Sequence, residues 1–154
     1  MVEKTTAPKR VLVTGSTGAI GQPVCEHLLA RGHVVRGFAR RPTPGLDDYV
    51  MGDLSDRAKV RQAVEGMEVV IHLGAYPNDA DFIDVLLEPN VRGLYHICDA
   101  AREFGIERLV LSSTMQTVSG HGFPDRAIRI DEGPAPVNHY ALTKVWSEDM
   151  GDMY

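Results

Sequence analysis

A tyrosine and a lysine four residues apart, Tyr140 and Lys144, are the side chains of this sequence best suited to acid–base chemistry. In a helix this spacing places both side chains on one face. An unperturbed phenol has a pKa of about 10, so proton transfer near neutral pH requires a nearby cation that stabilises the phenolate. The pair therefore predicts a tyrosine general acid/base that the lysine activates.

Three consecutive hydroxyl residues, Ser112, Ser113 and Thr114, stand at the end of an apolar run that predicts a strand at 108–112. Hydroxyl groups at such a position can hydrogen-bond a substrate oxygen. They can also do no more than satisfy backbone groups at the strand end. The sequence leaves both interpretations open.

A glycine-rich segment at 14–21 directly follows a short apolar run and opens an amphipathic pattern. Glycines at 15, 18 and 21 suit a tight turn, a close backbone approach to a pyrophosphate, and close packing of helix on strand. The helix N-terminus offers N–H groups and a positive dipole end to phosphates. Alternatively, these glycines serve only to form a tight turn. Their place between the first strand and the first helix favours a dinucleotide site.

Alternating apolar runs and helical patterns predict the elements that position these residues. Ser55 is expected to cap the second helix, and Pro89 to interrupt the first half of the third. The order favours an α/β fold, a Rossmann-type doubly wound parallel sheet that binds its ligand beyond the carboxyl ends of the strands. We expect strands at 10–14, 33–39, 50–51, 67–73 and 108–112, helices at 20–31, 55–65, 81–104 and 140–154, and a long surface loop at 120–138.

The spacing T-G-x-x-G-x-x-G at 14–21, with Y-x-x-x-K at 140–144, resembles the short-chain dehydrogenase/reductase superfamily. Within it, the nearest group is the extended branch, the NAD-dependent epimerase/dehydratase family, with sugar-nucleotide epimerases and uronate dehydrogenase-like enzymes. Segments 53–54, 72–75, 90–93 and 131–134 also resemble this family. The resemblance places the following residues against a nicotinamide cofactor: Gly15, Thr17, Gly18, Ala19, Ile20, Gly21, Asp53, Leu54, Leu73, Gly74, Ala75, Asn90, Ser112, Tyr140 and Lys144.

The resemblance also implies catalytic roles. Tyr140 would be the general acid/base, and Lys144 would activate it and bind the nicotinamide ribose. Thr114 or Ser113 would anchor the substrate oxygen. The segment 118–120 is Val-Ser-Gly where many relatives have Val-Tyr-Gly, and it comes one residue later, so the choice between the two hydroxyls stays open.

The end of the second predicted strand bears on the choice of cofactor. Position 39, where NAD-preferring enzymes have an acidic residue for the adenosine 2′-hydroxyl, is Ala39. Arg40 and Arg41 follow it, and two guanidinium groups suit a 2′-phosphate. This favours NADP. NAD remains the alternative if the arginines are only solvated surface residues.

The length of 154 residues predicts one domain: a polar N-terminal tail at 1–9 and an NAD(P)-binding Rossmann domain at 10–154 that is truncated after the Tyr-x-x-x-Lys helix. The net charge of −5 favours neither nucleic acid nor a membrane surface as partner. No apolar run approaches the ~18–20 residues of a membrane span, and the polar first residues do not resemble a signal peptide, which indicates a cytoplasmic protein. Cys25 and Cys98 are expected to be buried and unpaired, and no histidine has the spacing of a metal ligand, so we expect no metal site.

Members of the extended branch continue with a substrate-binding part that this sequence lacks, and they dimerise through the long helix and the final helix. The resemblance therefore implies an NAD(P)-dependent oxidoreductase or epimerase acting on a small molecule, a sugar or nucleotide-sugar, as a homodimer. The alternative is a cofactor-binding module without turnover.

Overall fold

Five parallel strands in the order β3-β2-β1-β4-β5 form the centre of the computed structural model, which describes residues 7–122 and 125–154. The strands are β1 (Arg10–Thr14), β2 (Val34–Ala39), β3 (Tyr49–Met51), β4 (Val69–His72) and β5 (Arg108–Leu111). From β1 the chain adds β2 and β3 on one side of the sheet. It then crosses to the other side of β1 and adds β4 and β5. This is the switch point at which such sheets bind ligands. The predicted fold class is confirmed.

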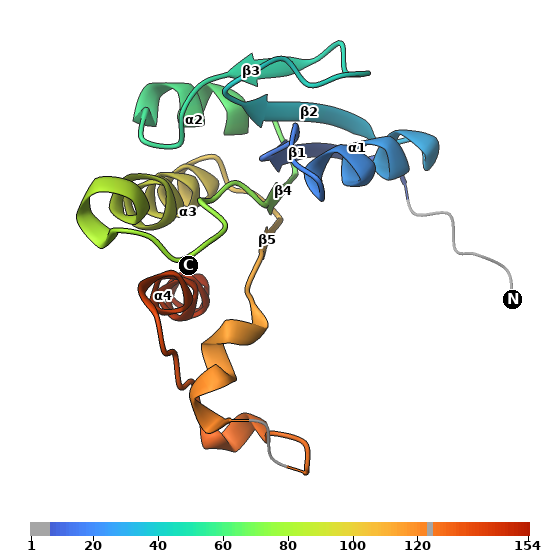
Figure 1. Ribbon diagram of the computed structural model, residues 1–154. Helices are drawn as coiled ribbons and strands as arrows, with labels where there is room; N and C mark the ends of the chain where they lie inside the picture. Colours follow the sequence, from blue (N-terminus) through green and yellow to red (C-terminus); the bar gives the residue numbers. More distant parts are fainter. Residues whose placement is uncertain (1–6, 123–124) are drawn as a thin grey trace, which may run out of the picture.

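Helices cover both faces of the sheet (Figure 1). They are α1 (Gly21–Ala30), α2 (Arg57–Val64), the π-helical η1 (Phe82–Arg92), α3 (Gly93–Glu103), the 3₁₀ helices η2 (Met115–His121) and η3 (Ile130–Glu132), and α4 (His139–Met153). The segment between β5 and α4 extends away from the sheet, and α4 lies beside η1 and α3.

The core consists of two apolar clusters, one on each face of the sheet. Successive side chains of β1 alternate between them, as the period of a strand requires. Leu12 packs with α2 and α3 residues such as Val60 and Ile97, whereas Val11 and Val13 pack against α1. Both faces are thus buried, which explains why β1 reads as a continuous apolar run.

Strand register brings the ends of four strands together. Thr14, the last residue of β1, pairs with Phe38 of β2 on one side and with His72 of β4 on the other. His72 in turn pairs with Leu111 of β5. The segments that follow these residues therefore leave the sheet side by side at its carboxyl edge.

Two local predictions were wrong. Asp56, not Ser55, caps α2: its side chain accepts a hydrogen bond from Lys59 N, while the amide and hydroxyl of Ser55 both donate to Asp53 Oδ1, at 3.0 and 2.9 Å. Pro89 does not interrupt the long helix, because η1 continues directly into α3. The backbone winds as a wider π-helix around the proline instead of breaking.

The remaining differences concern segment ends. The loop expected at 120–138 contains the end of η2 and all of η3. The strand ends differ from the expected bounds by at most two residues, and β3 starts one residue earlier than expected. Most of the predicted tail at 1–9 lies outside the described residues. Its last residue is attached to the sheet, since Lys9 Nζ lies 3.1 Å from Glu68 Oε1 and 2.7 Å from Glu107 Oε2.

Cys25 and Cys98 are both free and buried, as expected. Within residues 7–122 and 125–154, none of the helices has the length and apolar character that crossing a bilayer requires.

Candidate cofactor and active site

The glycine-rich turn between β1 and α1 packs too closely for side chains. A Cβ atom at Gly21 would lie 2.2 Å from Gly15 O, and one at Gly15, whose φ is +67°, would lie 2.9 Å from Gly74 N. Residues 18–20 are exposed, and no side chain caps the start of α1 at Ile20. An exposed turn of bare backbone at a helix N-terminus fits a pyrophosphate, whose oxygens need N–H donors at close range.

Thr14 joins this turn to the segment after β4. Its hydroxyl accepts a hydrogen bond from Gly74 N at 3.0 Å and lies 2.7 Å from His72 Nδ1. The predicted cofactor segment 72–75 is thereby fixed beside Gly15. Burial lowers the pKa of His72 to about 3, with a further contribution from the charge of Lys144. His72 is therefore a neutral partner of Thr14 at ordinary pH.

Tyr140 and Lys144 are buried on α4, only 8% and 7% exposed. The start of this helix is held at two points. Asn138 Oδ1 accepts from Ala141 N at 2.7 Å, and Asp79 Oδ1 accepts from the amides of His139 and Tyr140 at 3.1 and 3.3 Å. These caps accept hydrogen bonds from backbone N–H groups that have no partner within the helix. They also fix the position of the first turn of α4, which carries Tyr140.

Lys144 connects α4 to the carboxyl end of β5. Its ammonium donates to the carbonyl oxygen of Ser112 at 2.9 Å and to the Ser112 hydroxyl at 3.3 Å. Burial lowers the pKa of Lys144 below its ordinary value. The positive charge is thus held at the strand end, near His72.

The three hydroxyls after β5 have three different partners. Ser112 binds Lys144, and the exposed Ser113 donates to Glu148. The half-buried Thr114 caps η2 by accepting from Gln116 N at 3.3 Å. Since Thr114 Oγ1 acts there as an acceptor, its own proton is available for a further hydrogen bond.

Asn90 holds three elements together. Its side chain exchanges two hydrogen bonds with the backbone of Tyr76, at 2.7 and 3.1 Å, and donates to Thr143 Oγ1 at 3.2 Å. The loop after β4, η1 and α4 therefore meet at this amide. Asn90 thus positions these elements relative to one another, and its expected contact with the cofactor stays a prediction.

The residues expected at the adenosine end lie after β2 and β3. Arg40, Arg41 and Asp53 are exposed. A hydrogen bond from the Ser55 amide lowers the pKa of Asp53, and the charge of Arg40 lowers it further. Leu54 is 9% exposed and packs in the core, and its carbonyl oxygen lies 2.9 Å from His96 Nδ1. Arg40 and Asp53 thus lie near each other at the carboxyl edge.

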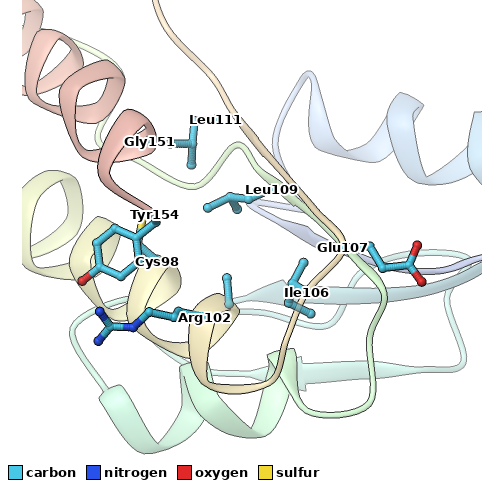
Figure 2. Close-up of a pocket in the computed structure, with 9 residues that line it drawn as sticks. Cys98, Arg102, Ile106, Glu107, Leu109, Leu111, Gly151 and Tyr154 are labelled. Atoms are coloured by element: carbon cyan, nitrogen blue, oxygen red, sulfur yellow. The ribbon is translucent and has the colours of Figure 1, made fainter.

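A hollow of about 250 Å³ lies away from these residues, between the C-terminal ends of α3 and α4 and the strand β5 (Figure 2). The Arg102 guanidinium lies over the Tyr154 ring, 4.9 Å from its centroid, at one side of it. The hollow is lined by Cys98, Ala101, Arg102, Ile106, Glu107, Leu109, Leu111, Gly151 and Tyr154, none of which was predicted as a site residue.

Three contributors to the site had no predicted role in the sequence analysis. Asp79 caps α4 from 60 residues away, a separation that leaves no local pattern to read. Thr14 and Ser16 were treated only as parts of the glycine motif, although a hydroxyl beside a glycine in a turn is a signal for a hydrogen bond across it.

The pKa of His72 is about 3 in the folded chain, whereas its ordinary value is 6.5. At a pH between these two values, the unfolded chain therefore binds a proton at His72 that the folded chain does not bind. The free energy of unfolding should therefore fall as pH is lowered below 6.5, by at most about 1.4 kcal/mol per pH unit for this proton. We expect His72→Gln to flatten this dependence between pH 7 and pH 5 in urea titrations, whereas His27→Gln, on the exposed face of α1, should not. An unchanged slope in His72→Gln would contradict the assignment.

Comparison with known proteins covers nearly the whole chain. Uronate dehydrogenase of Pseudomonas putida is 33% identical over 97% of this chain and 57% of its own length. L-arabinose 1-dehydrogenase (NAD(P)(+)) of Haloferax volcanii is 31% identical over 94% of this chain and 61% of its own length. The crystal structure of a short-chain dehydrogenase/reductase superfamily protein from Agrobacterium tumefaciens with bound NAD matches 94% of this chain, and 44% of that chain, with a TM-score of 0.85 and 32% identity.

The chain thus spans about three fifths of the length of these two curated relatives. The sequence model of the NAD dependent epimerase/dehydratase family matches residues 11–154, from the first strand to the last residue of the chain. The match includes the glycine-rich turn, the segment after β4 and the Tyr140–Lys144 pair. This chain belongs to the NAD-dependent epimerase/dehydratase family of the short-chain dehydrogenase/reductase superfamily.

Proposed function

We propose that residues 10–154 are the cofactor-binding and catalytic part of an NAD(P)-dependent dehydrogenase or epimerase that acts on a sugar or nucleotide-sugar. One observation carries this proposal: Lys144, buried on the same helix face as Tyr140, binds the carboxyl end of β5, at the same edge of the sheet as the exposed glycine turn that follows β1. An acid–base pair and a phosphate-binding turn on one sheet edge are the two parts that hydride transfer needs. The names of the relatives, uronate dehydrogenase and L-arabinose 1-dehydrogenase, support a sugar substrate.

A bound nicotinamide supplies a carbon that takes up or gives back a hydride. In the oxidation direction, the Tyr140 phenolate oxygen would take the proton of the substrate hydroxyl, while the substrate carbon that bears this hydroxyl would give its hydride, with both electrons, to the oxidised nicotinamide. The Lys144 charge stabilises the phenolate before that step. An epimerase uses the same residues and returns the hydride to the other face of the carbon.

Thr114 is the better candidate for the hydroxyl that anchors the substrate oxygen. The hydroxyl of Ser113 is already donated to Glu148, and Thr114 Oγ1 keeps its proton free while accepting from Gln116 N. This assignment is a proposal within the same mechanism.

The test is turnover with uronates, aldoses and nucleotide-sugars, followed by the absorbance of the reduced nicotinamide. Tyr140→Phe should lower kcat about 10²–10⁴-fold, because the general acid/base is lost, with little change in cofactor affinity. Tyr49→Phe, on the exposed strand β3, is the matched control. Full turnover by Tyr140→Phe would refute its role. Cofactor binding without turnover on any substrate would favour the alternative function, a binding module.

We propose NADP as the preferred cofactor. Ala39 offers no carboxylate to a ribose 2′-hydroxyl, and the exposed Arg40 and Arg41 suit a phosphate. The relative of known structure binds NAD, and the arabinose dehydrogenase is named for both cofactors, so relatives differ in this property.

Replacing both arginines, Arg40→Gln with Arg41→Gln, should weaken NADP binding about 10–100-fold, the effect of losing charge-assisted hydrogen bonds. NAD binding should stay within about twofold, since NAD lacks the 2′-phosphate that these arginines are proposed to bind. Arg108→Gln, at the amino end of β5, controls for the removal of one positive charge elsewhere on the surface, and calorimetry measures all affinities. Tighter binding of NAD than of NADP by the unsubstituted chain would overturn the preference.

We also propose a homodimer that buries the outer surface of η1 and α4. Ile83 is 64% exposed on η1, and Trp146, in edge contact with Phe82, is 37% exposed on α4. Sedimentation equilibrium should give a dimer mass, and Ile83→Glu should shift the equilibrium towards monomer by placing a charge in the buried surface. A monomer at all concentrations would contradict the proposal.

A further inference from the structure

A buried pair of hydroxyl groups fastens the glycine-rich turn to the loop after β2. Ser16, in the turn, is 0% exposed, and Thr43, in the loop, is 3% exposed. Their oxygens lie 2.5 Å apart and share a hydrogen bond across 27 residues of sequence. Each hydroxyl satisfies the other in a place from which water is excluded, so removing one leaves a buried polar group without this partner.

Gly37 of β2 provides the space that this pair occupies. A Cβ atom there would lie 2.5 Å from Thr43 Oγ1, 2.9 Å from Ser16 Oγ and 3.0 Å from Leu46 Cδ1. Any side chain at 37 would displace the hydroxyls or the leucine. The hydrogen-bonded pair therefore requires glycine at position 37, because the two hydroxyls fill the space that a side chain would occupy.

Leu46 provides a second attachment for the same loop. It is 8% exposed and packs with Val35 and Cys25 in the cluster under α1, and its amide donates to Thr43 O at 3.3 Å. The loop is therefore held at Ala39, where β2 pairs with Met51 of β3, and again at 43–46.

Arg40 and Arg41 lie between these attachments, on the short exposed stretch from 40 to 42. The Ser16–Thr43 hydrogen bond fixes the far side of the stretch that carries the arginines relative to the glycine turn, and Gly15 N, which donates to Phe38 O at 2.8 Å, fixes the near side. A ligand that places one phosphate on the turn and another at the arginines would meet a preformed site and would lose less affinity to ordering the loop.

We propose that Thr43, acting through Ser16, is a positioning residue for cofactor selection, which holds Arg40 and Arg41 where they can bind a 2′-phosphate while the pyrophosphate lies on the turn. The inference rests on the proposed preference for NADP. Thr43 itself touches no part of the cofactor in this scheme. Its effect should therefore fall on the ligand that carries the 2′-phosphate and spare the one that lacks it.

The experiment measures the affinities of NADP, NAD and adenosine 2′,5′-bisphosphate by calorimetry. Thr43→Val keeps the shape of the side chain and removes the hydroxyl. It should weaken NADP and the bisphosphate about 5–10-fold, the scale of one hydrogen bond, and NAD by less than about twofold. Thr43→Ser keeps the hydroxyl and should bind all three ligands like the unsubstituted chain.

The double variant Ser16→Ala with Thr43→Val keeps the test decisive if Thr43→Val alone is unstable. Removing both hydroxyls leaves no unpaired polar group, so the melting temperature should recover while NADP affinity stays low. Equal weakening of NADP and NAD, or no weakening of either, would overturn the positioning role and leave the NADP preference intact. Preference of the unsubstituted chain for NAD would overturn both.

Discussion

The contact between backbone atoms at the switch point of the sheet constrains everything around it. Gly15 lies against Gly74 on one side and Gly21 on the other, at separations that leave no room for a Cβ atom. Because β1 and β4 are adjacent, any side chain there would push the turn, the start of α1 and the segment after β4 apart. Thr14 strengthens the same junction through its hydroxyl. The bare backbone that suits a pyrophosphate is thus also what allows three segments to meet.

The proposed acid–base pair, Tyr140 and Lys144, is positioned from the opposite side, by α4. This helix lies outside the sheet, and its place is set by contacts with distant segments: Asp79 at its start, Asn90 through Thr143, and Ser112 through Lys144. Each contact joins α4 to a segment that follows a strand of the sheet or to η1. These contacts therefore fix the position of the proposed acid–base pair relative to the glycine turn, although α4 and the turn are far apart in the sequence.

The sequence predicted most of the fold because its signals are local. Apolar runs marked all five strands, and glycines marked the ends of helices. It failed where two local signals competed. Ser55 and Asp56 are both good caps, and the choice depended on Asp53, which already binds Ser55. Pro89 carries a strong breaking signal, but packing of η1 against α3 and α4 kept the helix continuous as a π-helix. The candidate site residues were predicted from motifs, whereas the contacts of Asp79, His72 and Thr43 join distant segments and could not be predicted from spacing.

Two basic side chains, Lys144 and His72, are buried near the strand ends, but the site holds one positive charge rather than two. Burial lowers the pKa of both Lys144 and His72, since each would lose hydration as a cation. Lys144 starts from an ordinary value of 10.5 and donates to two oxygens of Ser112, which compensate its charge. His72 starts from 6.5. Burial, and to a smaller extent the repulsion between its protonated form and the lysine charge, lowers its pKa to about 3, and the neutral ring pairs with the hydroxyl of Thr14. A neutral histidine can therefore join the end of β1 to β4 beside the buried lysine, without adding a second cation to the charge that the proposed acid–base role of Tyr140 requires.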